Sequence, residues 1–235
     1  MQLNEVMQEL EALGSEQTKR TYVRHGAPEP LFGVKVGDMK KLTKHVKKNQ
    51  QLALDLYRTG NSDAKYLAGL SVNPRSMTKE QLIAWAQEAN WYMLSEYTVA
   101  QVTAESPYAL ELAREWIDAE DELLESCGWS TYANYVSITA DEELPLDELR
   151  GLLKRVEETI HAQKNRVRYT MNGFVIAVGC YVQPLHEEAV HTAGQLGKVN
   201  VNMGDTACKV PEAPGYIQKV AERGSIGQKR KTCIC

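Results

Sequence analysis

The chain has 235 residues, a mass of 26.4 kDa and a formal net charge of −4, which fits one large domain or two small ones. Hydrophobic residues make up 43% and charged residues 25% of it, so wholesale disorder is excluded. No apolar run approaches the ~20 residues that a membrane helix needs. The N-terminus is acidic and amphipathic and the cysteine count of five is odd, so we expect a cytoplasmic protein with reduced thiols.

The dominant hydrophobic period along the chain is helical. Two helix starts have clear signals: Thr78 and Gln81 have the spacing of a capping box, and Asn90 can cap the helix that follows it. The predicted helices span residues 3–13, 39–46, 52–57, 64–70, 82–89, 91–104, 107–117, 121–126, 129–138, 147–164, 166–181, 185–196 and 211–222. Residues 199–202 are the only plausible extended piece, and the basic tail 224–235 has no folding signal of its own.

The fold class predicted from this pattern is all-α. The cap positions Asp38, Thr78 and Glu120 are 40 and 42 residues apart, a period typical of HEAT-like helix pairs. Because the units share no residue-level identity, a compact, non-repeating helical domain explains the spacing nearly as well. In either case we expect one domain, residues 1–235.

Charge is divided along the chain. Residues 18–48 have a net charge of +7 and residues 161–235 have +5, whereas residues 49–160 have −12. If the fold brings the two basic stretches to one side, they form a positive surface for an acidic partner such as nucleic acid. The alternative is that these charges lie on ordinary solvated helix faces.

Signals for metal or cofactor chemistry are weak. His186 and His191 are five residues apart, which places their side chains more than a helical turn from each other, and Cys233 and Cys235 have no partner pair at ligand spacing. The sequence has no phosphate-binding loop, no dinucleotide fingerprint and no nucleophile elbow. We therefore expect neither a metal nor a cofactor.

One acidic residue has an unusual helical setting. Glu96 has Tyr92 four residues before it and Val99 three residues after it, so its helical neighbours are aromatic or apolar. One interpretation is an anion beside a stacking surface, suited to a cationic or oxocarbenium-like species. The other is a structural carboxylate that pairs with a cation on an adjacent helix or caps a helix end.

A later segment, residues 166–179, starts basic and becomes apolar all round, as a buried helix would. Gly173 and Gly179 suggest close packing of helices or close approach of a ligand. Asn172 needs a hydrogen-bond partner there, and a buried structural role is the alternative to contact with a base. The consecutive cations at residues 229–231 suit phosphates, although such runs also serve solubility.

Seven segments, in order along the chain, resemble the DNA alkylation repair (AlkD-like) family of HEAT-like-repeat DNA glycosylases. They are residues 31–36 (LFGVKV), 63–69 (DAKYLAG), 116–118 (WID), 128–129 (GW), 168–179 (RYTMNGFVIAVG), 204–211 (GDTACKVP) and 227–232 (GQKRKT). The resemblance implies a curved superhelix of antiparallel helix pairs whose concave, basic face holds duplex DNA. It also implies excision of N3- and N7-alkylated purines from double-stranded DNA. We further expect a monomer that has no metal and no contact with a membrane.

The resemblance further implies site residues. Trp91 and Tyr92 match an aromatic pair, and Glu96 falls at the place of a family aspartate, so these three are the expected catalytic residues. A family arginine falls near Tyr132, and a family tryptophan falls near Phe174. The expected DNA-binding residues are Lys35, Trp129, Tyr132, Arg166, Arg168, Asn172, Lys229, Arg230 and Lys231.

Four departures from the family pattern affect the expected chemistry: Asp becomes Glu, Trp becomes Tyr, Arg becomes Tyr, and a further Trp is missing or replaced by Phe. A carboxylate still stabilises positive charge on the departing sugar, but Tyr is a weaker cation-binding face than Trp. The changes predict a slow or redirected activity. Three hypotheses follow: an alkylpurine glycosylase that uses Glu96, a non-catalytic DNA-binding protein, and a protein-interaction scaffold.

Overall fold

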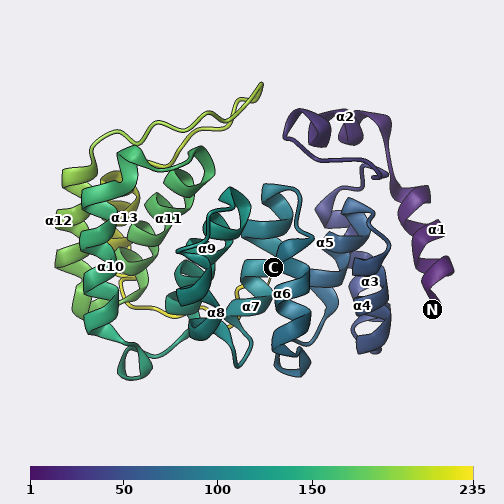
Figure 1. The fold of residues 1–235 in the computed structure, drawn as a ribbon, viewed down its shortest axis with the longest axis horizontal. Helices are drawn as coiled ribbons and strands as arrows, with labels where there is room; N and C mark the ends of the chain where they lie inside the picture. Colours follow the sequence, from purple (N-terminus) through teal and green to yellow (C-terminus); the bar gives the residue numbers. More distant parts are fainter. Residues whose placement is uncertain (235) are drawn as a thin grey trace. The chain divides into compact units, whose positions relative to one another are not determined.

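The computed structural model describes residues 1–234, and every regular element in that range is a helix (Figure 1). Cys235, the last residue of the predicted tail, lies outside this range. The α-helices are α1 (Leu3–Leu13), α2 (Glu16–Arg24), α3 (Val36–Val46), α4 (Gln50–Arg58), α5 (Ser62–Ser71), α6 (Lys79–Gln87), α7 (Ala100–Ala104), α8 (Ala109–Trp116), α9 (Glu122–Ile138), α10 (Leu146–Thr159), α11 (Asn165–Tyr181), α12 (His186–Leu196) and α13 (Ala213–Glu222). The predicted all-α class is confirmed.

Short helical segments join several of these helices. They are η1 (Pro74–Ser76), η3 (Asp141–Glu143), η4 (Ile160–Ala162) and η5 (Gln183–Leu185), together with a π-helical segment, η2 (Met93–Val99). Among residues 1–234, no helix is both long enough and apolar enough to cross a bilayer.

Four helices start at a constant interval. The helices α3, α6, α9 and α11 begin at Val36, Lys79, Glu122 and Asn165, which are 43 residues apart each time. This interval lies within the range of about 40–47 residues that is typical of HEAT-like helical repeats. Of the three predicted caps, only Thr78 is correct: it forms the predicted capping box at the start of α6.

The other two predicted caps were misplaced. Asp38 lies inside the first turn of α3, where it pairs with Lys41 at 2.6 Å, and Glu120 precedes the true cap of α9, Asp121. An acid favours a helix N-terminus at several positions within the first turn, so its presence does not specify which residue is the cap. The true starts give a regular repeat that the predicted starts had blurred.

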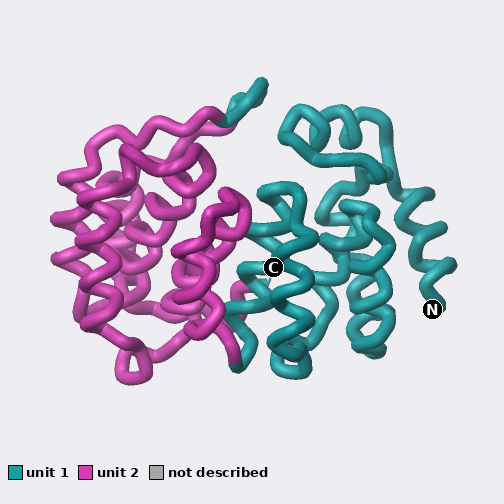
Figure 2. The backbone as a smooth tube through the Cα atoms, in the orientation of Figure 1, with its two compact units in different colours: residues 1–107, 203–207, 234–235 teal, residues 108–202, 208–233 magenta. Residues whose placement is uncertain are grey.

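The chain divides into two compact units (Figure 2), and each is described by itself. The first unit consists of residues 1–107, 203–207 and 234. Its centre is α5, nine of whose ten residues are buried, and α3, α4 and η2 pack on it. Helix α2 was not predicted, because only one of its residues, Thr18, is buried and the segment has no apolar period.

The second unit consists of residues 108–202 and 208–233. Its centre is the pair α9 and α11, on which α8, α12 and α13 pack. The core here includes Trp129, Phe174 and Val178, each 0% exposed. Between α12 and α13, residues 197–212 form a loop without helix or strand, and residues 203–207 of this loop belong to the first unit (Figure 1).

The surroundings of two glycines in this unit differ from those that the sequence predicted. The sequence predicted separate helices on either side of Gly128, but α9 continues through it. A Cβ atom at Gly128 would lie 2.6 Å from the backbone nitrogen of Ile117, so this glycine permits close packing of α8 on α9. At Gly173, by contrast, an added Cβ atom would meet no other side chain or neighbouring backbone within 4 Å, and the predicted close packing there is wrong.

The tail was expected to have no fold of its own, and it is instead tied to the second unit. The backbone N–H of Gly227 donates to the carbonyl of Cys180 at 2.9 Å, and that of Arg230 donates to Ser137 at 2.8 Å. Gly179, close to the first of these contacts, packs against Ile217 of α13 as predicted from its place in an apolar helix. Docking onto α9 and α11 orders the tail.

Candidate functional site

The predicted carboxylate lies on a widened helical turn, and the predicted aromatic pair directly precedes that turn. The sequence predicted one α-helix over residues 91–104, whereas the segment η2 (Met93–Val99) is π-helical and α7 follows it. The hydroxyl of Thr98 donates to the carbonyl of Met93, five residues back, at 3.2 Å. Single π-helical turns of this kind occur frequently at functional sites.

His25 holds both residues of the aromatic pair. The indole Nε1 of Trp91 donates to the carbonyl of His25 at 2.8 Å, and the hydroxyl of Tyr92 lies 3.0 Å from the ring nitrogen Nδ1 of the same histidine. The ring of Trp91 also packs on Tyr22 at 5.5 Å and meets Tyr92 edge to face at 5.9 Å. The pair is therefore fixed to the C-terminal end of α2, a contact that the sequence analysis missed.

Burial limits what this trio can contact. Trp91 is 5% exposed and Glu96 is 2% exposed, whereas Tyr92 is half-buried. The carboxylate of Glu96 thus lies inside the protein, on the segment that directly follows the aromatic pair. An anion in such a position interacts strongly with nearby cations, because little water screens it.

A second carboxylate that the sequence analysis did not select organises the loop before α3. Asp63 is 2% exposed, and its oxygens accept hydrogen bonds from the backbone N–H groups of Phe32, Gly33 and Val34 at 2.6, 3.0 and 2.9 Å. Burial raises the pKa of Asp63, while the three N–H groups act in the opposite direction. Asp63 is in the first turn of α5, whose cap is Asn61.

Two of the predicted DNA-binding residues are core residues of the second unit. Trp129 and Tyr132 are both 0% exposed, and each meets the edge of Phe174, at 5.4 and 6.1 Å. Their predicted contact with DNA is therefore wrong in this structure. Aromatic residues at helical spacing fill the core between α9 and α11, a role that sequence alone does not separate from a binding role.

Tyr132 belongs to a polar network instead. Its hydroxyl donates to Glu148, which also accepts a bidentate pair of bonds from Arg114, the shortest at 2.6 Å. The Arg114 bond lowers the pKa of Glu148, and burial raises the pKa of Tyr132 well above its usual range. The network joins α8, α9 and α10 within this unit.

The predicted contacts on α11 divide into two kinds. The guanidinium of Arg166 stacks on the ring of Tyr169 at 4.4 Å, and Arg168 donates to Asn165 at 3.3 Å; both arginines are half-buried. Asn172, in contrast, is 1% exposed and donates to the carbonyl of Pro211 at 2.9 Å. The structural alternative is confirmed for Asn172, and its predicted contact with DNA is wrong.

The tail cations also divide. The ammonium of Lys229 binds the carbonyl of Val136 at 2.9 Å and the carboxylate of Asp141 at 2.8 Å, with 19% of its side chain exposed, so it anchors the tail. Lys231 is exposed, Arg230 is half-buried, and Lys35 is exposed at the start of α3. For these last three residues, contact with DNA stays a prediction.

No metal centre is assembled by the residues that the structure describes: they contain no group of three or more His, Cys, Asp or Glu side chains placed to hold an ion. What they do present is a helical scaffold with a fixed aromatic pair, a buried carboxylate and scattered exposed cations. Such a set can bind an anionic polymer and stabilise a cation.

The repeat interval and the all-helical units define a HEAT-like repeat protein. A model of the family described as DNA alkylation repair enzyme matches residues 6–217, so the chain belongs to this family. It is 40% identical to the uncharacterized protein Lin0241 of Listeria innocua serovar 6a and 39% identical to Lmo0209 of Listeria monocytogenes serovar 1/2a. Each match runs over 221 residues and covers 92% of this chain and 95% of the relative.

A solved structure also matches the whole chain. It has a TM-score of 0.91 and 41% sequence identity, and the match covers 100% of both chains. That protein is described as one of a new family related to the HEAT-like repeat DNA glycosylases with affinity for branched DNA structures. The fold expected from the family resemblance is confirmed.

Proposed function

We propose that this protein binds DNA and prefers branched DNA, in which duplex arms meet at a junction, over linear duplex. The observation that carries the preference for branched DNA is the match over the whole chain to a protein described as having affinity for such structures. The aromatic pair argues against an open site for an excised base. Trp91 is buried and its indole N–H is bonded to His25, so the pair is a structural element of the first unit rather than an open surface for a base. The affinity for branched DNA described for the relative of 41% identity supports the same conclusion.

Charge supports binding to DNA in general. Exposed cations occur in both units, for example Lys35 in the first and Lys231 in the second. Lys and Arg that contact phosphates release condensed counterions, which gives sequence-independent affinity that falls with salt. A junction brings phosphates from several strands close together. A protein with cations on two units can therefore contact more phosphates on a junction than on one duplex, and its affinity for the junction is higher.

The experiment compares a four-way junction, a three-way junction and a linear duplex of matched length and sequence. Fluorescence anisotropy at several salt concentrations gives the dissociation constants and the salt dependence. We expect tighter binding to both junctions than to the duplex, by at least about tenfold, or ~1.4 kcal/mol. Equal affinity for all three would refute the preference for branches, and no binding at low salt would refute the DNA-binding function.

A second candidate function is excision of N3- and N7-alkylated purines. The buried carboxylate of Glu96 favours it, because an anion in a poorly hydrated site stabilises positive charge on the departing sugar. Incubation with duplex that contains N7-methylguanine tests this function directly. Release of the free base would support excision, whereas tight binding without release would support the non-catalytic proposal.

The expected cytoplasmic location and monomeric state stay predictions.

A further inference from the structure

Helix α2 is mostly exposed to solvent, yet several hydrogen bonds attach it to the rest of the first unit. Thr18 is the one buried side chain in its nine residues, all of which the structure describes. The helix is nonetheless held at both ends: the backbone N–H of Ser15 donates to the carbonyl of Gly33 at 3.1 Å, and His25 contacts Trp91 and Tyr92. In the middle, the hydroxyl of Tyr22 donates to the carbonyl of Val34 at 2.9 Å. The inner side of α2 is thus fixed while its outer side is open.

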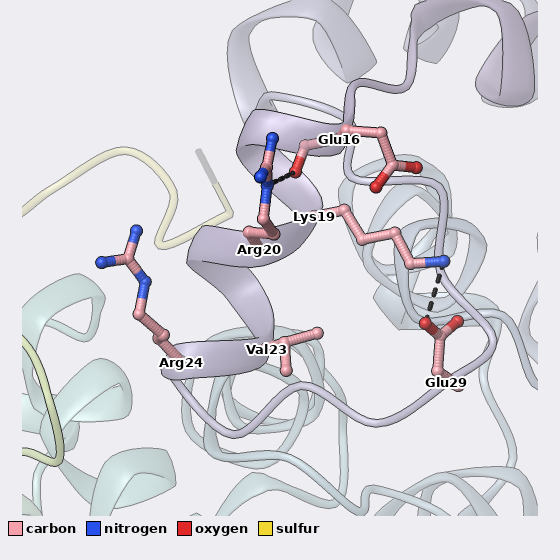
Figure 3. Close-up of a pocket in the computed structure, with 6 residues that line it drawn as sticks. All are labelled: Glu16, Lys19, Arg20, Val23, Arg24 and Glu29. Atoms are coloured by element: carbon pink, nitrogen blue, oxygen red, sulfur yellow. Dashed lines mark hydrogen bonds and ion pairs between the residues drawn. The ribbon is translucent and has the colours of Figure 1, made fainter.

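The outer side of α2 carries two arginines on one helical face. Arg20 and Arg24 are four residues apart, a spacing that makes side chains neighbours on a helix. Figure 3 shows both guanidinium groups directed to the same side, away from Lys19 and Glu29, which pair with each other at 2.8 Å. These residues line a surface pocket of about 490 Å³, together with Glu16 and Val23.

Neither arginine is neutralised by a carboxylate. The Nε of Arg20 donates to the backbone carbonyl of Glu16 at 3.2 Å, and within residues 1–234 the side chain of Arg24 makes no hydrogen bond or ion pair. The nearby acid Glu29 is occupied by Lys19, which lowers its pKa and keeps it ionised. Four other arginines pair with acids: Arg58 with Asp55, Arg114 with Glu148, Arg150 with Glu188 and Arg155 with Asp118. Arg75 and Arg223 are also exposed without an acidic partner among the described residues, but neither has a second arginine one helical turn away.

Two adjacent, uncommitted guanidinium groups on a fixed helix suit a phosphodiester backbone. Guanidinium presents its N–H donors as a planar fork that matches two phosphate oxygens, and it stays charged at any physiological pH. Because α2 is already held in place by His25 and Tyr22, little further ordering of the backbone is needed when the arginines bind.

We propose that the outer face of α2 is a phosphate-binding surface for DNA, in which Arg20 and Arg24 contact successive phosphates of one strand. The proposal rests on the proposed DNA-binding function and assigns it to particular residues. Through His25, which directly follows Arg24, the helix fixes these phosphate contacts relative to Trp91 and Tyr92. Of the basic stretch 18–48, the predicted DNA-binding residues include Lys35 but neither arginine.

The test measures binding of a four-way junction by Arg20→Gln, Arg24→Gln and the double variant across a salt series. We expect each single change to weaken binding about tenfold, the scale of one charge-assisted hydrogen bond. Each should also flatten the dependence of log K on log salt by about one charge. Both side chains are exposed, so thermal unfolding should be unchanged.

The matched control is Arg58→Gln, which removes the same charge from an exposed arginine of the same unit that already pairs with Asp55 at 3.1 Å. We expect its affinity to stay within about twofold of the wild type, because Asp55 already compensates the charge of Arg58 and leaves that arginine less available to a phosphate. If wild type binds the junction and the α2 variants bind equally well, the α2 proposal is overturned while the DNA-binding function stands. If Arg58→Gln weakens binding as much as they do, the effect is one of net charge and the α2 proposal is likewise overturned. If wild type binds no DNA, both proposals fail.

Discussion

Replacing Asp63 should release the loop that connects α2 to α3. Its carboxylate accepts three backbone hydrogen bonds, from Phe32, Gly33 and Val34. Asp63→Ala removes the acceptor for all three donors at once. Asp63→Asn keeps one carbonyl oxygen, which can accept two of the bonds, but it turns an NH₂ group toward the third donor.

The magnitude follows from the number of donors left without a partner. A buried donor that loses its acceptor costs about 1–3 kcal/mol, and bonds to a charged acceptor lie at the upper end. For Asp63→Ala we expect a loss of about 4 kcal/mol, less than three full penalties because Phe32 is half-buried and water can reach part of the loop. For Asp63→Asn we expect about 2–3 kcal/mol. Either is a large share of the ~5–15 kcal/mol that stabilises a typical domain.

Hydrogen exchange of the backbone amides over residues 32–34 is the most direct assay, and urea unfolding gives the global free energy. Exchange should accelerate at these amides before the rest of the first unit is affected. Asp55→Asn is the control, since Asp55 pairs with Arg58 on the surface and should cost less than about 1 kcal/mol. Unchanged protection over residues 32–34 in Asp63→Ala would refute the reasoning.

Three further predictions concern other sites. Arg114 lowers the pKa of Glu148 below the ordinary value of 4.5. The free energy of unfolding of wild type should therefore exceed that of Glu148→Gln above pH 4.5, and this difference should shrink as the pH falls through the lowered pKa. A difference that grows on acidification would contradict this. Gly128→Ala should destabilise the protein by about 1–3 kcal/mol, because the added Cβ atom would meet the backbone at the end of α8. Gly173→Ala has open space around it and should be neutral or stabilise the protein by up to about 1 kcal/mol. Urea unfolding measures both changes. If the protein excises alkylated purines, Glu96→Gln should slow base release by about 10²–10³ at unchanged duplex affinity, and equal single-turnover rates would exclude Glu96 from the chemistry.

Local signals predicted the helices well where they were strong. The capping box at Thr78 places the start of α6 correctly, and the apolar period of residues 3–13 coincides with α1. Both signals depend on residues within one or two turns of each other, so the sequence contains all the information. Helix α2 was missed because contacts such as Tyr22 to Val34 hold it rather than an apolar stripe.

The candidate site was less accessible from sequence. Family resemblance selected Trp91, Tyr92 and Glu96, and these three do share one segment, but it did not indicate that His25 fixes the aromatic pair. That contact joins residues 66 and 67 positions apart in the chain, and no local pattern records such a distance.

By itself, the sequence determined the helical class, the positions of most helices and the family, because hydrophobic period, caps and ordered motifs are local properties of the chain. Only the tertiary structure decided which polar and aromatic side chains face the solvent. Trp129 and Asn172 lie in the core although both suited a binding surface, while Arg20 and Arg24 stay exposed, with no carboxylate partner among the described residues. The physical reason is that burial depends on which helices pack together, and the same side chain serves a core or a surface according to its neighbours across that packing.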